Sequence, residues 1–163
     1  MMEKKLEIDA IDRHILKILQ ADCGLPIQEI SDRVGLSVNP CWRRIRKLEA
    51  EGVISKRVAI VDSSRLGLGV TVFVTVRTNR HDKDWLDSFA RAVDQIPEIM
   101  ECHRMSGDSD YFLKVQVRDI AHYDRVYKHL VELSPDLFDV SSTFSMEQIK
   151  LSSVLDPALG REG

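Results

Sequence analysis

Residues 28–52 read QEISDRVGLSVNPCWRRIRKLEAEG. Ile30 lies on the apolar side of a short helix that ends at Gly35, and Ser37 suits the N-cap of a second helix. Apolar residues recur along this second helix at helical spacing, and Gly52 suits its C-terminal cap. A short helix, a tight turn and a longer basic helix are typical of a helix-turn-helix.

The second helix, expected over about residues 37–50, carries four cations within five positions. A solvated basic face is the usual explanation of such a run on its own. The preceding helix and turn favour DNA binding instead, because the second helix of this motif enters the major groove and its cations bind phosphates. The expected DNA contacts are Ser37, Asn39, Trp42, Arg43, Arg44, Arg46 and Lys47. For Trp42, packing or a contact with the phosphate backbone remains an alternative to base reading.

An earlier helix completes this part of the chain. Ile8, Ile11, Ile15 and Ile18 recur at helical spacing from residue 8 onward. We therefore predict a three-helix DNA-binding domain over residues 8–55. Residues 56–69 are expected to link it to the rest of the chain, with a short strand from Lys56 to Val61 followed by a connector.

Three different motifs follow one another along this domain. They are Ile8-Asp9-x-x-Asp12-Arg13-x-Ile15-Leu16, Arg33-Val34-Gly35-Leu36-Ser37, and Pro40-Cys41-x-x-Arg44-Ile45-x-x-Leu48-Glu49. Together they resemble the winged helix-turn-helix domain of the leucine-responsive and asparagine-regulator (Lrp/AsnC) transcription factors. The resemblance implies a sequence-specific transcriptional regulator.

The second part of the chain alternates strand and helix patterns. Residues 70–77 alternate apolar and polar side chains, and strands of the same kind are expected over 99–106, 111–117 and 140–146. Apolar residues at helical spacing predict one helix around Trp85 and Phe89 and another around Tyr123 and Leu130. The order strand, helix, strand, strand, helix, strand predicts an α+β, ferredoxin-like antiparallel sheet with helices on one face. Its uncovered face predicts a homodimer.

Two further motifs fall in this second domain, predicted over residues 70–153. They are Glu101-Cys102-His103-x-x-Ser106-Gly107-Asp108-x-Asp110-Tyr111 and Phe144-x-Met146-Glu147-x-Ile149-Lys150. They resemble the effector loop and final strand of the Lrp/AsnC regulatory (RAM, ACT-like) domain, which binds amino acids between neighbouring subunits. The resemblance assigns effector binding to His103, Gly107, Asp108, Asp110, Thr143, Phe144 and Ser145. By residue type alone, a turn whose aspartates cap its own amides is the alternative.

The resemblance also sets expectations for the effector and the assembly. Asp22-Cys23 and Pro40-Cys41-Trp42 are most similar to a branch of the family that responds to cysteine. The expected effector is cysteine, leucine or another small amino acid, without any other cofactor. The expected partners are double-stranded DNA and further copies of the chain, as a homodimer or a larger oligomer such as an octamer. A cytoplasmic, nucleoid-associated protein with a flexible tail over 154–163 is expected.

Charge and composition constrain the alternatives. The 163 residues carry a net charge of −3, which argues against DNA binding for one uniform domain. Residues 1–66, however, carry +2 and residues 67–163 carry −5. No apolar run approaches the ~20 residues of a membrane span, and neither the three cysteines nor the five histidines show metal-ligand spacing. Two rivals remain: an ACT-like amino-acid-binding subunit without a DNA role, and a small enzyme that uses His103, Asp108 and Asp110.

Overall fold

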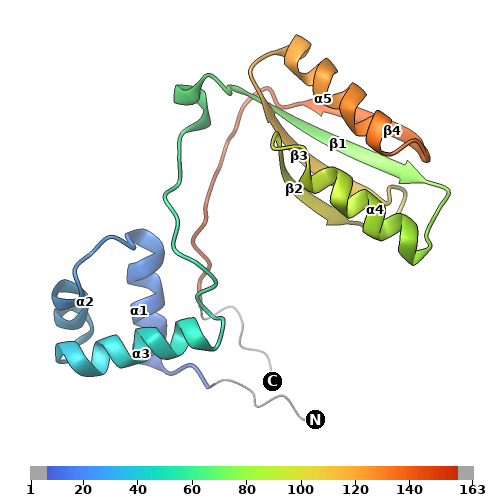
Figure 1. The fold of residues 1–163 in the computed structure, drawn as a ribbon. Coiled ribbons are helices and arrows are strands. Elements are labelled where there is room, and N and C mark those ends of the chain that lie inside the picture. Colours follow the sequence, from blue (N-terminus) through green and yellow to red (C-terminus); the bar gives the residue numbers. More distant parts are fainter. Residues whose placement is uncertain (1–6, 158–163) are drawn as a thin grey trace. The chain divides into compact units, whose positions relative to one another are not determined.

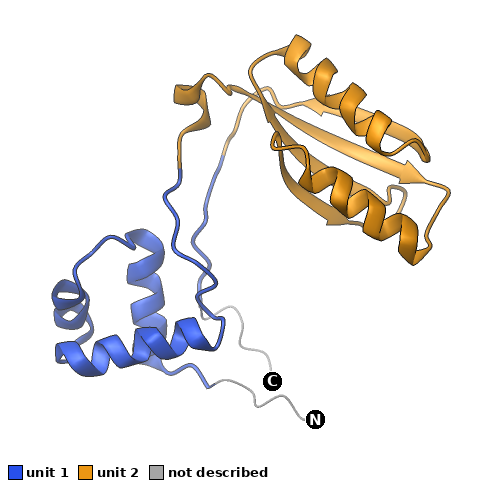
Figure 2. Cartoon of the chain, viewed as in Figure 1, with its two compact units in different colours: residues 1–60, 150–163 blue, residues 61–149 orange. Residues whose placement is uncertain are grey.

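The computed structural model describes residues 7–157 of the chain. The chain divides into two compact units (Figure 2), of which the first comprises residues 1–60 together with 150–163 and the second comprises residues 61–149. No helix within residues 7–157 is both long and apolar enough to cross a membrane.

The first unit is built from three helices (Figure 1): α1 Ala10–Ala21, α2 Ile27–Val34 and α3 Val38–Ala50. Asp9 caps α1, since its carboxylate accepts the Asp12 N–H at 2.8 Å. Gly35 ends α2 with a φ of +71°, a left-handed conformation that glycine adopts without steric cost. Ser37 occupies the N-cap position of α3, although its side chain makes no capping hydrogen bond.

The apolar faces of these helices share one core. It contains Ile15, Leu16, Ile18, Leu19, Ile30, Cys41, Ile45 and Leu48. Cys41 is fully buried in this core, and burial raises the pKa of its thiol, so Cys41 acts as a packing residue. The core fixes which side of α3 faces outward.

The segment that follows α3 differs from its prediction. Lys56–Val61 was expected to form a strand, but it forms none in the structure, and that expectation is wrong. A strand needs a partner for its backbone N–H and C=O groups, and within residues 7–60 and 150–157 no strand is present. The chain instead runs without regular structure to η1, Ser63–Leu66.

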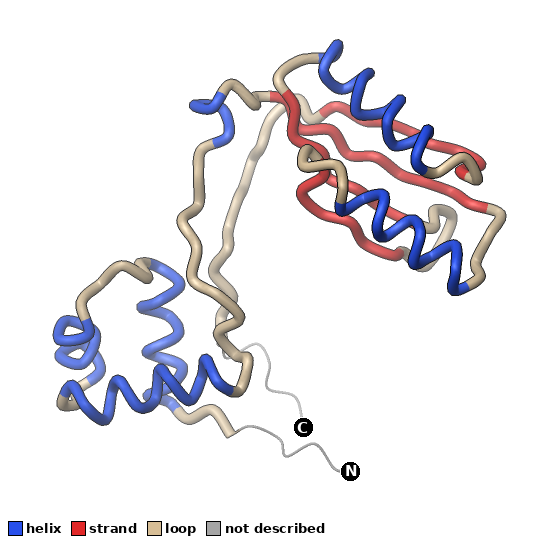
Figure 3. Tube along the Cα trace, in the orientation of Figure 1, coloured by secondary structure: helices blue, strands red, loops and turns tan. Residues whose placement is uncertain are grey.

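The second unit confirms the α+β, ferredoxin-like prediction. Its strands and helices (Figures 1 and 3) are β1 Val70–Thr78, α4 Lys83–Asp94, β2 Ile99–Arg104, β3 Tyr111–Val117, α5 Ile120–Leu133 and β4 Leu137–Phe144. The strand order is β2-β3-β1-β4, and all neighbouring strands are antiparallel. Both helices cover the same face of the sheet (Figure 3).

Alternation along the strands separates a core face from an open face. Val72, Val74 and Val76 of β1 are buried in the core that contains Trp85 and Phe89 of α4. The side chains between them point to the other face, which neither helix covers. On this open face Phe73 stacks on Phe112, with ring centroids 5.6 Å apart.

The chain returns to the first unit after β4. Gln20 of α1 binds the backbone of Leu155 twice: its Oε1 accepts the Leu155 N–H at 2.7 Å, and its Nε2 donates to the Leu155 carbonyl at 2.9 Å. Lys17 forms an ion pair with Asp156 at 3.5 Å. The described part of the predicted flexible tail is therefore bonded to α1, whereas residues 158–163 lie outside the described residues.

Candidate nucleic-acid interface and effector site

One face of α3 is exposed and basic. Because Cys41, Ile45 and Leu48 point into the core, the residues between them point outward. Six of the seven residues expected to contact DNA lie exposed: Ser37, Asn39, Trp42, Arg43, Arg46 and Lys47. We refer to these six residues as the recognition face. They come from one helix and its N-cap position, which suits a helix that enters a groove.

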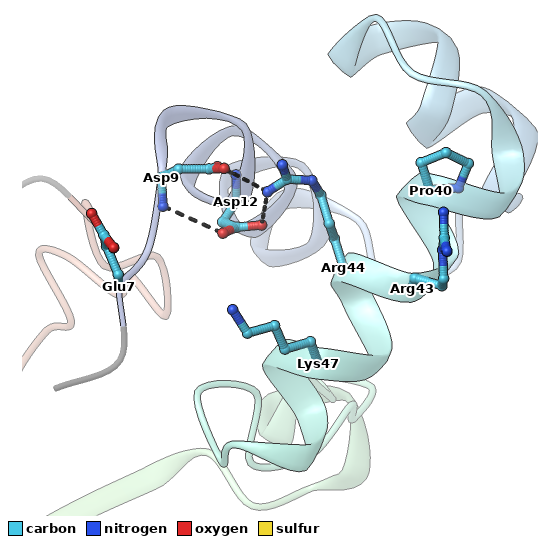
Figure 4. Close-up of a pocket in the computed structure, with 7 residues that line it drawn as sticks. All are labelled: Glu7, Asp9, Asp12, Pro40, Arg43, Arg44 and Lys47. Atoms are coloured by element: carbon cyan, nitrogen blue, oxygen red, sulfur yellow. Dashed lines mark hydrogen bonds and ion pairs between the residues drawn. The ribbon is translucent and has the colours of Figure 1, made fainter. Parts of the chain in front are cut away.

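Arg44 is the exception, because its guanidinium is engaged within the first unit. Its Nη1 donates to Asp9 Oδ2 at 2.6 Å and to Asp12 Oδ1 at 2.8 Å (Figure 4). The Asp12 side chain is only 8% exposed. Hydrogen bonds to the two carboxylates raise the pKa of the guanidinium further, and Arg44 ties α3 to the start of α1.

Arg43 and Lys47 are the free cations of the recognition face. They line a hollow of about 690 Å³ together with Glu7, Pro40, and Arg44 with its two aspartate partners. Figure 4 shows both side chains without bonds to the acids, and within residues 7–157 neither has an ion-pair partner. Cations that are not neutralised by the chain are available to phosphates.

Trp42 and Arg46 form the rest of the exposed surface. Trp42 is 53% exposed, which is unusual for so large an apolar side chain, and the Arg46 guanidinium lies 5.9 Å from its ring centroid. Arg46 also pairs with Glu49 at 3.1 Å. Trp42 is thus not a core residue, so a contact outside the first unit is favoured over packing.

The expected effector loop connects β2 to β3. Gly107 has a φ of +131°, and a side chain there would meet no atom within 4 Å, so conformation and not space requires glycine. Asp110 Oδ2 accepts the Thr78 N–H at 2.8 Å, and the Asp110 N–H donates to the Val76 carbonyl at 2.9 Å. Asp110 therefore anchors the loop to β1, and its carboxylate caps an amide of β1 and not one of the turn itself. Asp108 is exposed and has no partner among the described residues.

His103 lies in β2 on the open face of the sheet. Its Nε2 is 3.3 Å from Glu101 Oε2, and Glu101 Oε1 accepts from Lys114 Nζ at 2.9 Å. The bond from Lys114, and secondarily that from His103, lowers the pKa of Glu101. Sequence reasoning missed Glu101 and Lys114 as neighbours of His103, because their pairing depends on the register between β2 and β3.

The other expected effector residues lie far from the loop. Thr143 pairs with Phe73 in the first half of β1, and the Ser145 N–H donates to the Thr71 carbonyl at 2.9 Å, whereas the loop is bonded to Thr78 at the last residue of β1. Thr71 and Thr78 are seven residues apart on β1, or about 23 Å at ~3.3 Å per residue. Within one protomer, the expected effector residues therefore form two separate groups.

Phe144 differs from its two neighbours in the direction of its side chain. It packs edge-on against Tyr123 of α5, with ring centroids 5.4 Å apart, whereas Thr143 and Ser145 share the open face. Strand alternation makes this division unavoidable for three consecutive residues.

Comparison with known families identifies both units. Residues 8–55 match the winged helix-turn-helix DNA-binding family, and residues 71–155 match the Lrp/AsnC ligand binding domain. The chain belongs to the Lrp/AsnC family. This Lrp/AsnC protein is therefore a DNA-binding transcriptional regulator with a ligand-binding domain, and not an enzyme.

Individual relatives agree with this assignment. The regulator is 50% identical over 149 residues to the glutamate uptake regulatory protein of Zymomonas mobilis, a match that spans 91% of this chain and 90% of that protein. It is 43% identical over 148 residues to the DNA-binding transcriptional activator DecR of Escherichia coli, covering 91% and 97%. An AsnC family regulator from Agrobacterium tumefaciens superimposes with a TM-score of 0.86 at 49% identity, covering 90% and 95%.

Proposed function

We propose that this regulator binds operator DNA through the recognition face of α3, as a homodimer or larger oligomer in the cytoplasm. An amino acid bound between two protomers shifts its DNA affinity or its assembly. The observation that carries the DNA-binding part is the single exposed face of α3, on which Arg43 and Lys47 have no ion-pair partner among the described residues.

The separation of the two effector groups supports a site shared between protomers. The loop at Gly107 and Asp108 lies beside the last residue of β1, whereas the segment Thr143–Ser145 lies beside its first half. A second copy that meets the open face in antiparallel orientation would bring the loop of one protomer to the β4 end of the other. Such a two-fold axis would also present two α3 helices to successive turns of DNA, about 34 Å apart.

An amino acid fits the chemistry of this shared site. Gly107 exposes backbone donors to an α-carboxylate, and the free carboxylate of Asp108 suits an α-ammonium. A regulator from Neisseria meningitidis, 30% identical with a TM-score of 0.86, has been solved as an L-Met complex. We propose a small amino acid as effector, with cysteine, leucine and methionine as the first candidates to test.

A gel shift tests the function as a whole. The full-length protein should retard a DNA duplex taken from upstream of its own gene. One of these amino acids should change the protein concentration at which half of the duplex is retarded. Retention of the amino acid without any binding to DNA at low salt would instead favour a ligand-binding subunit.

The dimer predicts a large effect of a charge on the open face. Phe73→Glu should raise the dimer dissociation constant by roughly 100-fold, because burying an unpaired carboxylate costs about 3 kcal/mol. Size-exclusion chromatography with light scattering measures the change in mass. Ile120→Glu is the matched control, since Ile120 is 71% exposed and starts α5 on the helical side of the sheet. Equal masses for all three proteins would rule out this face as the interface.

The effector site predicts a specific loss at Asp108. Asp108→Asn should weaken amino-acid binding about tenfold or more, the contribution of one charge-assisted hydrogen bond, without a change in melting temperature. Calorimetry with cysteine, leucine and methionine measures it, and Asp87→Asn on the exposed surface of α4 serves as control. Asp110 is a poorer choice, because its replacement also removes the bond to Thr78. Unchanged affinity in Asp108→Asn would exclude the proposed ammonium contact.

A further inference from the structure

Glu49 lies between two arginines near the end of α3. Its Oε2 accepts from Arg46 Nη1 at 3.1 Å, and its Oε1 accepts from Arg57 Nη2 at 2.7 Å. Arg46 belongs to the recognition face, whereas Arg57 lies in the irregular segment that leads from α3 toward the second unit. One carboxylate thus connects a DNA-facing cation to a cation of the linker.

The surroundings of Glu49 strengthen this connection. Trp42, Arg46, Glu49 and Arg57 line a hollow of about 280 Å³ together with four apolar side chains, which are Leu25, Ile27, Ile30 and Ile45. The Glu49 side chain is 25% exposed, so solvent screens its interactions less than those of a fully exposed ion pair. Arg46 also lies over the Trp42 ring, so a change at Glu49 is transmitted to two residues of the recognition face.

The charge balance depends on Arg57. With Arg57 in place, two guanidinium groups share one carboxylate, and the cluster keeps a net positive charge beside the recognition face. Without Arg57, the carboxylate neutralises Arg46, and the cluster offers no net charge to a phosphate. No other cation within the described residues forms an ion pair with the Glu49 carboxylate.

We infer that Arg57 is a positioning residue for DNA binding, which shares the Glu49 carboxylate with Arg46 and thereby keeps Glu49 from fully neutralising Arg46. The inference rests on the proposed recognition face. Arg57 lies three residues before the boundary of the first compact unit at residue 60. A displacement of the linker would therefore act on the Arg57–Glu49 pair and lower DNA affinity through Arg46.

A double-mutant cycle on the full-length protein tests this role. The variants are Arg57→Gln, Glu49→Gln, the double variant and Arg57→Lys, and fluorescence anisotropy with a labelled mixed-sequence duplex at low salt gives the affinity of each. We expect Arg57→Gln to weaken binding about fivefold, the upper range for a partly exposed ion pair. Glu49→Gln should bind at least as tightly as the unmodified protein, the double variant should match Glu49→Gln, and Arg57→Lys should restore most of the affinity.

Arg65→Gln is the matched charge control. Arg65 follows in the same connection, is 87% exposed on its side chain and pairs with Asp62 at 3.4 Å instead of with α3. Its replacement removes the same charge and should change affinity less than twofold.

Two outcomes would overturn the inference. If Arg57→Gln causes the same loss in the unmodified protein and in the Glu49→Gln variant, Arg57 itself contacts phosphate or only supports the fold. No loss in either background would mean that the pair is inert.

The proposed recognition face is tested separately by Arg43→Ala/Lys47→Ala in the same assay. If that double substitution has no effect, the proposed function fails. If that double substitution weakens binding but the effects of Arg57→Gln and Glu49→Gln simply add, only the proposed role of Arg57 is refuted.

Discussion

Replacement of Arg44 by alanine should lower the free energy of unfolding of the first unit by about 2 kcal/mol, between the effects of exposed and buried ion pairs. The salt dependence of DNA binding should stay unchanged. The loss arises because Asp12, with its side chain 8% exposed, would keep a charge whose cationic partner has gone. The link between α3 and the start of α1 would also be lost.

Thermal unfolding measures this effect as a decrease in melting temperature of roughly 10 °C for a unit of this size. Arg43→Ala is the matched control, because Arg43 is the neighbouring residue, lies exposed and has no partner among the described residues. It should change stability by less than ~0.5 kcal/mol. If Arg44→Ala leaves the melting temperature unchanged but reduces the slope of log K against log salt, Arg44 contacts DNA and does not stabilise the unit.

The same substitution has a defined pH dependence. The Asp12 backbone N–H, and to a smaller extent Arg44, lower the pKa of Asp9 in the folded protein. A lowered carboxyl pKa adds stability above the ordinary value of about 3.9, and this stability is lost as the pH falls through the folded value. The difference in the free energy of unfolding between the unmodified protein and Arg44→Ala should therefore be largest at neutral pH and should decrease below about pH 4.

The second large effect concerns the free cations. Arg43→Ala/Lys47→Ala should weaken DNA binding by roughly 10- to 100-fold at moderate salt, because two phosphate contacts per protomer are removed. The slope of log K against log salt should fall by about two per protomer, at ~0.9 per phosphate. Since both side chains lie exposed, the melting temperature should stay constant.

The control for this pair is Lys83→Ala/Arg91→Ala. Both residues lie exposed on α4, so the same two charges are removed from the other unit. This control should keep the salt slope within experimental error. Equal losses for both pairs would show that only the overall charge of the protein attracts DNA, and the recognition face would then have no special role.

The sequence predicted the elements because their signals are local. Apolar spacing located α3 at residues 37–50 and β1 from residue 70 onward, and the structure has them at Val38–Ala50 and Val70–Thr78. The order of these elements was enough to predict the ferredoxin-like sheet. Six of seven expected DNA contacts are exposed for the same reason, since the helical period alone separates the core side of α3 from its outer side.

The strand expected at Lys56–Val61 shows what local sequence patterns cannot predict. Its residues suit a strand, but a strand exists only if another strand pairs with it, and the first unit has none among its described residues. The family resemblance likewise assigned both Asp108 and Asp110 to one ligand site. Only the register of the sheet shows that Asp110 is bonded to Thr78, while Asp108 has no partner within residues 7–157.

The sequence by itself determined the two units, their elements and the side of α3 that faces outward, because periodicity and caps depend on residues within a few positions of one another. Tertiary structure decided which charges are available. Arg44 meets Asp9 across 35 positions of sequence, and Glu49 is shared between Arg46 and Arg57. An ion pair depends on where helices and loops bring side chains together, and four neighbouring cations of one helix therefore differ in their ion-pair partners.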